Sequence, residues 1–113
     1  MAEGWQGWDE YAPFYDWENA RTVARRDVAF WQRLASAQSG PVLELGCGTG
    51  RITAPVARTG VRIVGIDRSA PMLARASQRL ARARLTAGLL RGDIRALPFR
   101  RRVKFHLVMA PYG

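Results

Sequence analysis

Three residue types are scarce in this chain of 113 residues: it has one cysteine (Cys47), one histidine (His106) and one lysine (Lys104). A single cysteine excludes a disulfide within the chain, which fits a reducing compartment such as the cytoplasm. We see no group of His, Cys and Asp residues with metal-ligand spacing. No apolar run approaches the roughly 20 residues of a membrane-spanning helix, and residues 1–30 lack the pattern of a secretory signal. We therefore expect a cytoplasmic protein with no bound metal.

The charge is dominated by one sign. Lysine and arginine together number 18 against 9 acidic residues, so the formal net charge is +9. Such a balance can indicate nucleic-acid binding. The basic residues are nevertheless spread along the chain, with their tightest cluster at residues 100–102. We interpret most of this charge as a solvated surface, and we keep an arginine-rich nucleic-acid binder as an alternative.

The hydrophobic pattern alternates between strands and helices. Apolar residues recur every three or four positions over residues 17–37, which predicts a helix with Trp17 and Trp31 in the core. Strands are predicted at residues 42–45, 62–66, 85–90 and 103–109, and helices at residues 51–58 and, after the N-cap Ser69, up to residue 84. This alternation is typical of an α/β fold with a parallel sheet and helices on its faces.

The most informative segment is Pro-Val-Leu-Glu-Leu-Gly-Cys-Gly-Thr-Gly at residues 41–50. A strand there enters a turn whose glycines let a ligand approach the main chain closely. A dinucleotide site expects Gly-x-Gly-x-x-Gly, and Arg51 stands where that pattern has its last glycine. The carboxylate of Glu44 would oppose a pyrophosphate but attract the ammonium and sulfonium of S-adenosylmethionine (SAM). The turn therefore favours SAM.

Two further acids follow the next predicted strands. From the end of its strand, Asp67 could accept hydrogen bonds from both ribose hydroxyls of a nucleoside, and Asp93 could accept one from an adenine amine. Cys47 is expected to be a small loop residue and not a nucleophile. Thr49 is expected to be a turn or cap residue, and contact with the SAM carboxylate is an alternative role. The acids at three strand ends together predict one nucleoside pocket.

Residues 42–50 resemble the first motif of class I SAM-dependent methyltransferases. Val64-Gly-Ile-Asp-Arg-Ser69 is similar to the motif that follows it, Gly92-Asp93 resembles the adenine-binding motif, and residues 105–113 resemble the fourth strand with its exit loop. The resemblance implies a Rossmann-like parallel sheet with helices on both faces. The chain would supply an N-terminal helix and then the first four strands, in the order 3-2-1-4, of a seven-stranded fold.

The resemblance also implies a site and an activity. The residues it assigns to SAM are Glu44, Gly46, Cys47, Gly48, Gly50, Asp67, Arg68, Asp93 and Ile94, together with Tyr11 and Tyr15 of an N-terminal segment that covers the cofactor in many relatives. The activity is methyl transfer, and the aromatic N-terminal segment favours a small-molecule acceptor. No catalytic residue is assigned, because the residues that recognise the acceptor usually follow the fourth strand in this family.

We divide the chain into an aromatic segment with a cap helix, residues 1–38, and a SAM-binding core, residues 39–113, which stops after the fourth strand. A non-catalytic fragment or a split-protein half is therefore a second hypothesis, in which the exposed edge of the fourth strand pairs with another segment. His106 stands where the family usually has Asp, and we expect it to have a structural role at the start of that strand.

Overall fold

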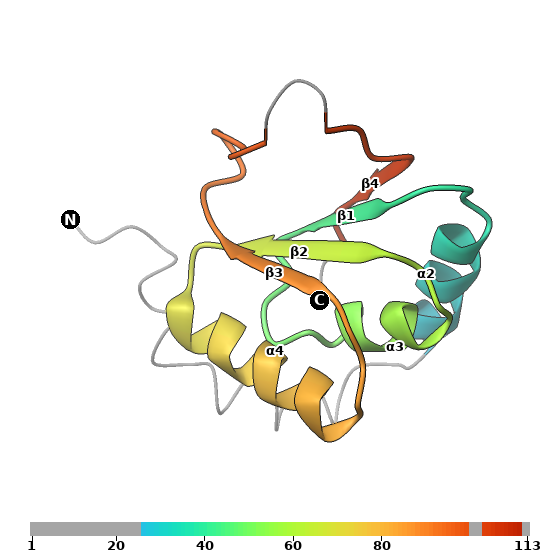
Figure 1. The fold of residues 1–113 in the computed structure, drawn as a ribbon, viewed down its shortest axis with the longest axis horizontal. Coiled ribbons are helices and arrows are strands. Elements are labelled where there is room, and N and C mark those ends of the chain that lie inside the picture. The colour runs from blue at the N-terminus through green and yellow to red at the C-terminus, as the bar shows by residue number, and fades with distance from the viewer. Residues whose placement is uncertain (1–25, 100–102, 112–113) are drawn as a thin grey trace.

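The computed structural model describes residues 26–99 and 103–111 (Figure 1). Trp17, Tyr11, Tyr15 and the basic cluster at residues 100–102 lie outside the described residues. The elements are, in chain order, α2 (Arg26–Ser36), β1 (Val42–Leu45), α3 (Thr53–Arg58), β2 (Ile63–Asp67), α4 (Ala70–Arg82), β3 (Gly88–Arg91) and β4 (Leu107–Met109).

The described strands form one sheet in the order β3-β2-β1-β4, and every pair in it is parallel. This confirms the predicted order. Val42 of β1 lies opposite Ile63 of β2 on one side and Leu107 of β4 on the other, so β1 is central. The chain moves from β1 toward β3 and then returns to add β4 at the opposite side. The strand order therefore reverses beside β1, which is where open α/β sheets bind their ligands.

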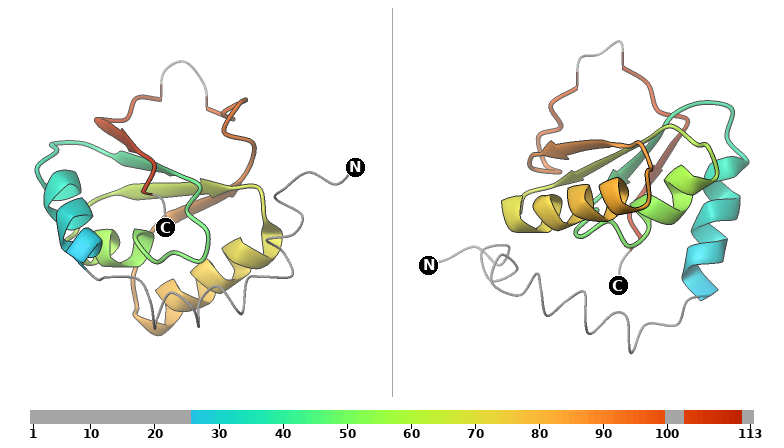
Figure 2. Two further views of the ribbon diagram at one scale, coloured as in Figure 1. Left: turned by 180° about the vertical axis from the view of Figure 1, so that it is seen from behind. Right: turned by 60° about the horizontal axis from the view of Figure 1, so that its bottom comes forward.

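The helices of the described part lie on one face of the sheet (Figures 1 and 2). Crossovers between parallel strands are right-handed almost without exception, and β1–α3–β2 and β2–α4–β3 run in the same direction across the sheet. Both crossovers therefore place their helices on the same face, and α3 contacts α2 as well as α4. Of the predicted helices on both faces, the described residues show those of one face, since residues 92–99 and 103–106 form no helix.

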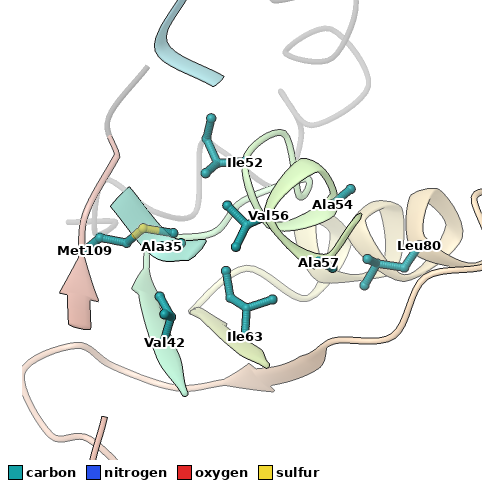
Figure 3. Close-up of a cluster of buried hydrophobic side chains, with 9 residues drawn as sticks. All are labelled: Ala35, Val42, Ile52, Ala54, Val56, Ala57, Ile63, Leu80 and Met109. Atoms are coloured by element: carbon teal, nitrogen blue, oxygen red, sulfur yellow. The ribbon is translucent and has the colours of Figure 1, made fainter. Parts of the chain in front are cut away.

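The core lies between this helical layer and the sheet (Figure 3). Val56 of α3 is fully buried above Val42 and Ile63 of the central strands. The complete cluster is Ala35, Val42, Ile52, Ala54, Val56, Ala57, Ile63, Leu80 and Met109, with Trp31 packed against it. Burying one aliphatic side chain contributes about 1.5–3 kcal/mol. The core therefore fixes the helices, and with them the β1–α3 loop, on the sheet.

The third and fourth strands are shorter than the sequence pattern predicts. The third prediction began at residue 85, and the fourth covered residues 103–109, but the ladders begin at Gly88 and at Leu107. Val103 is 46% exposed, while the ring of Phe105 meets that of Phe99 edge-on at a centroid distance of 5.1 Å. The apolar residues before β4 therefore belong to a returning loop and not to the sheet.

His106 directly precedes β4, so it lies at the amino edge of the sheet, opposite the carboxyl edge where α/β sheets bind their ligands. The backbone N–H of His106 donates to the carbonyl of Pro41 at 2.8 Å, and the ring Nδ1 is 3.2 Å from the Ser39 hydroxyl. A Cβ added at Gly40 would come within 2.5 Å of the ring. These contacts tie the entry to β1 to the entry to β4, which is a structural role.

Candidate cofactor-binding site

The loop of residues 46–50 joins β1 to α3 at the carboxyl edge of the sheet. Gly46 and Gly48 have φ angles of +66° and +55°, and a Cβ at either position would meet no atom of the described residues within 4 Å. The N–H groups of Gly46 and Cys47 donate to the carbonyl of Ile66 at 2.8 and 3.1 Å, which fixes the loop against β2. The backbone of this loop is thus held in place and faces open space at two glycines.

Gly50 differs from the other two glycines of the loop. A Cβ at Gly50 would lie 3.3 Å from the Cβ of Ala76 on α4, and its φ angle is +84°. Gly50 is also buried. Close packing of the loop against α4 therefore explains why a glycine stands at position 50. From the sequence alone, this reason could not be distinguished from close contact with a ligand.

Glu44 is a buried carboxylate near the carboxyl end of β1. Its side chain is 2% exposed, and the Thr53 hydroxyl donates to Oε1 at 2.6 Å. The pKa of Glu44 is raised to about 7, chiefly because the carboxyl is buried; the Thr53 hydrogen bond and the charge of Arg51 lower the pKa in part, and the Asp67 carboxylate adds to its increase. A cation bound beside Glu44 would offset the cost of its ionisation.

Asp67 connects the loop with the start of α4. Its Oδ2 accepts from the N–H of Gly48 at 2.9 Å, and its Oδ1 accepts from the N–H of Ser69 at 3.0 Å. Ser69 in turn caps α4, as predicted, because its hydroxyl accepts from the N–H of Met72. An ionised carboxylate offers about four acceptor positions. Each oxygen of Asp67 therefore keeps capacity for a further donor.

Asp93 follows β3 and is engaged by arginine. The guanidinium of Arg95 donates to both carboxylate oxygens over 2.7–3.1 Å, and Arg68 Nη1 lies 3.5 Å from Oδ2. The hydrogen bonds from Arg95 lower the pKa of Asp93 to about 2. The neighbouring Ile94 is 52% exposed. The structure thus brings Arg68, Asp93 and an accessible apolar side chain together beside β2 and β3.

Thr49 is a buried polar residue of the loop. It is 1% exposed, and among the described residues its Oγ1 has no hydrogen-bond partner. Leaving a buried hydroxyl unsatisfied costs about 1–3 kcal/mol. An acceptor or donor supplied by a ligand would remove that cost.

Sequence reasoning assigned no site role to three groups. Thr53 follows Glu44 by nine residues, and no pattern in the sequence predicts their hydrogen bond. Arg51 served only to exclude a dinucleotide motif, yet its guanidinium pairs with Asp27 of α2. Arg95 lies in a loop, and the only sequence feature that could have indicated its pairing with Asp93 is that the two residues are two positions apart.

Cys47 is buried at 5% exposure, and burial raises the pKa of its thiol well above the usual range, with further increases from Glu44 and Asp67. We expect the folded chain to react with a disulfide reagent at pH 8 on the order of 100-fold more slowly than the same chain in urea. Absorbance of the released thiolate measures both rates. Equal rates in the two states would contradict the burial of the Cys47 side chain, which lies so close to Gly65 that a Cβ there would be 2.7 Å from Cys47 Cβ.

The described residues contain neither a metal-binding cluster nor a membrane-spanning helix. No group of three or more His, Cys, Asp or Glu side chains in the described residues could hold a metal ion. Over residues 26–99 and 103–111, none of the helices has the length and apolarity to cross a membrane.

Comparison with known proteins identifies the family. The model of the methyltransferase domain family matches residues 42–113, which is more than half of the chain, and the chain belongs to this family. A demethylmenaquinone methyltransferase of Tropheryma whipplei is 43% identical over 77 residues, which cover 63% of this chain and 31% of that protein. The chain thus spans about a third of the length of this relative.

Solved structures agree with this assignment. The glycopeptide N-methyltransferase MtfA, crystallised with SAM, is 32% identical, with a TM-score of 0.59 over 74% of this chain and 35% of that one. A structure from Methanococcus maripaludis gives a TM-score of 0.78 at 18% identity, over 90% of this chain and 49% of that one, and so supports the fold alone. The strand order of the described sheet is that of the Rossmann-like methyltransferase fold.

Proposed function

We propose that this chain binds SAM at the carboxyl edge of its sheet and serves methyl transfer to a small-molecule acceptor. One observation carries the proposal. Glu44, Asp67 and Asp93 stand at the ends of three neighbouring strands around a glycine loop, and Asp67 also binds the loop backbone through Gly48. We propose residues 39–113 as the SAM-binding core and residues 1–38 as a segment that covers it, with Tyr11 and Tyr15 as contacts.

The described residues fit this cofactor in several respects. Glu44 is a buried acid whose ionisation a ligand ammonium would favour. The Thr49 hydroxyl has no hydrogen-bond partner within the described part of the chain, and the methionine carboxylate would supply one. Gly46, Cys47 and Gly48 offer backbone to the methionine portion. Asp67 keeps acceptor capacity for the ribose hydroxyls, and the adenine would lie by Asp93 with Ile94 and Arg68 beside it.

SAM supplies the methyl group on a sulfonium, which is already a good leaving group. The residues of this chain therefore bind and orient, and holding two reactants in line can contribute roughly 7–11 kcal/mol to lowering a barrier. No residue described here is proposed as a general base. The choice of a small-molecule acceptor is supported by the names of two similar proteins, a demethylmenaquinone methyltransferase and a glycopeptide N-methyltransferase. A lone buried thiol remains compatible with the cytoplasm as the proposed compartment.

Calorimetric titration with S-adenosylhomocysteine (SAH) tests the proposal. We expect saturable binding with one site per chain and no heat of binding with NADH. Titration with a polynucleotide is the comparison for the arginine-rich alternative, because such binding falls steeply with salt. NADH binding without a response to SAH would overturn the proposal, and so would salt-sensitive polynucleotide binding in the absence of any SAH binding.

A further inference from the structure

A cavity of about 580 Å³ lies at the amino edge of the sheet, opposite the glycine loop. Pro41, Arg62 and Ala87, which line it, directly precede the strands β1, β2 and β3. Its apolar lining includes the buried Ile63 and the partly buried Leu85, which packs against the core. Pockets for small ligands typically measure roughly 300–1,000 Å³ and are mostly apolar. The cavity thus has the size of a small-molecule site, and none of the residues that we propose for SAM lines it.

The charge at this edge of the sheet has one sign. Arg62 and Arg84 both line the cavity. Each acid of the described residues lies instead at the carboxyl edge, either at or just after a strand end or paired with the residue that follows the glycine loop: Glu44, Asp67, Asp93 and Asp27. Within residues 26–99 and 103–111, the side chains of Arg62 and Arg84 therefore have no carboxylate partner. Two arginines beside an apolar lining favour a negatively charged ligand.

Arg84 has a backbone conformation that glycine adopts more easily. Its φ angle is +55°, and it follows α4 in a Schellman motif, in which the N–H of Leu85 donates to the carbonyl of Leu80 at 2.9 Å. α3 also ends at a residue with positive φ, but there the residue is Gly60, with a φ angle of +89°. The fold therefore keeps a strained arginine at the helix end that lines the cavity. Strain of this kind is concentrated at functional sites.

We propose that this cavity binds a small organic acid, with Arg62 and Arg84 at its carboxylate and the apolar lining around its aliphatic or aryl body. The planar guanidinium has donors in a fork that matches the two oxygens of a carboxylate. An inorganic anion would leave the apolar lining unused, and a neutral apolar molecule would leave the arginines without a partner. The proposal is separate from SAM binding, because the two sites lie at opposite edges of the sheet.

The lining also distinguishes this ligand from a nucleic acid. Single strands bind in basic grooves by stacking their bases on aromatic side chains. Among the described residues that line the cavity, none is aromatic. An organic acid therefore fits the cavity better than a polynucleotide does.

The test uses octanoate as the probe and follows the backbone amide signals of the full chain by NMR. We expect saturable shifts at the amides of Val61, Thr86 and Ala87, which line the cavity. Octanol and inorganic phosphate each carry one half of the required chemistry, so each should bind about tenfold more weakly or less. A single-stranded polynucleotide at low salt is the fourth ligand of the series.

Arg84→Gly separates a role in binding from a role in folding. The variant loses a guanidinium and relieves the positive φ angle, so octanoate should bind about tenfold more weakly while Tm rises by about 4–8 °C. Arg62→Gln should weaken octanoate binding as well. Arg33→Gln, which removes an exposed arginine in the last turn of α2, is the matched charge control and should bind octanoate as the wild type does.

Saturable octanoate shifts at this edge that weaken in Arg84→Gly and Arg62→Gln, but not in Arg33→Gln, support the inference. Equal binding of octanol, equal losses in all three variants, or no saturable response to octanoate would overturn it. Shifts at the same amides with the polynucleotide and not with octanoate would also overturn it, in favour of a nucleic-acid surface. Arg84→Gly should bind SAH as the wild type does, so failure of the octanoate test and failure of the proposed function are read from different titrations.

Discussion

Replacing Asp67 with alanine is expected to weaken SAH binding about 100-fold. Each carboxylate oxygen already accepts one hydrogen bond, from Gly48 or from Ser69, and its remaining acceptor capacity is what we propose the ribose hydroxyls use. A hydrogen bond to a charged group contributes about 1.5–3 kcal/mol, and each 1.4 kcal/mol corresponds to about a factor of ten in affinity. Calorimetry of the wild type and the variant measures the loss directly.

The same substitution also removes the side-chain acceptors of two backbone N–H groups, those of Gly48 and Ser69, so a control that leaves the protein unchanged is needed. An SAH analogue with a 2′-deoxyribose removes one hydroxyl from the ligand and should bind the wild type about tenfold more weakly. The Asp67→Ala variant should not distinguish the analogue from SAH, because its partner for that hydroxyl is already absent. If the analogue binds more weakly than SAH by the same factor in the variant as in the wild type, Asp67 does not contact the ribose.

The central strands and the loop between them could be predicted from sequence. β1 and β2 are buried by a helical layer, so most of their residues are apolar, and the observed β1 has the predicted bounds of residues 42–45. Three glycines with positive φ angles leave a recognisable mark, because other residues are strained there. The order of the strands came from the family resemblance and not from periodicity.

The peripheral strands could not be placed from hydrophobicity. Residues 103–106 have strand composition, yet Phe105 is used in a contact with Phe99, and the β4 ladder has only three residues. Likewise, Leu85 packs against the core without belonging to β3. An apolar residue in a returning loop and one in an edge strand are indistinguishable in sequence, since both bury a side chain against the same sheet.

The side-chain partners of the site were equally inaccessible to sequence reasoning. The pairs Glu44–Thr53 and Asp27–Arg51 join residues 9 and 24 positions apart, and only the packing of α2 and α3 brings them together. The net charge of +9 also gave no hint of a site with three carboxylates. Much of the local positive charge is compensated there, as in the pairing of Arg95 with Asp93. Net charge describes the surface, whereas the site depends on local pairing.

Glu44→Gln is expected to separate stability from binding. The pKa of Glu44 is raised from 4.5 to about 7 in the folded chain, so between these values the folded state binds more protons than the unfolded state. The free energy of unfolding should therefore fall as pH rises from 4.5 to 7, by at most roughly 3 kcal/mol. The glutamine variant should lack this decline and be more stable than the wild type at pH 8, less the cost of burying its amide N–H groups.

Binding should change in the opposite direction. At pH 8 the wild-type carboxylate is ionised and attracts the SAH ammonium, so Glu44→Gln should bind SAH at least about tenfold more weakly. Urea unfolding from pH 5 to pH 8, together with calorimetry at pH 8, measures both effects. Asp93→Asn is the matched control for the stability slope, because the lowered pKa of Asp93 lies outside this range. A glutamine variant that loses stability at pH 8 and binds SAH as the wild type does would show that Glu44 is a structural acid. The expected pattern would instead mean that the fold retains a costly buried carboxylate for its affinity toward a cation.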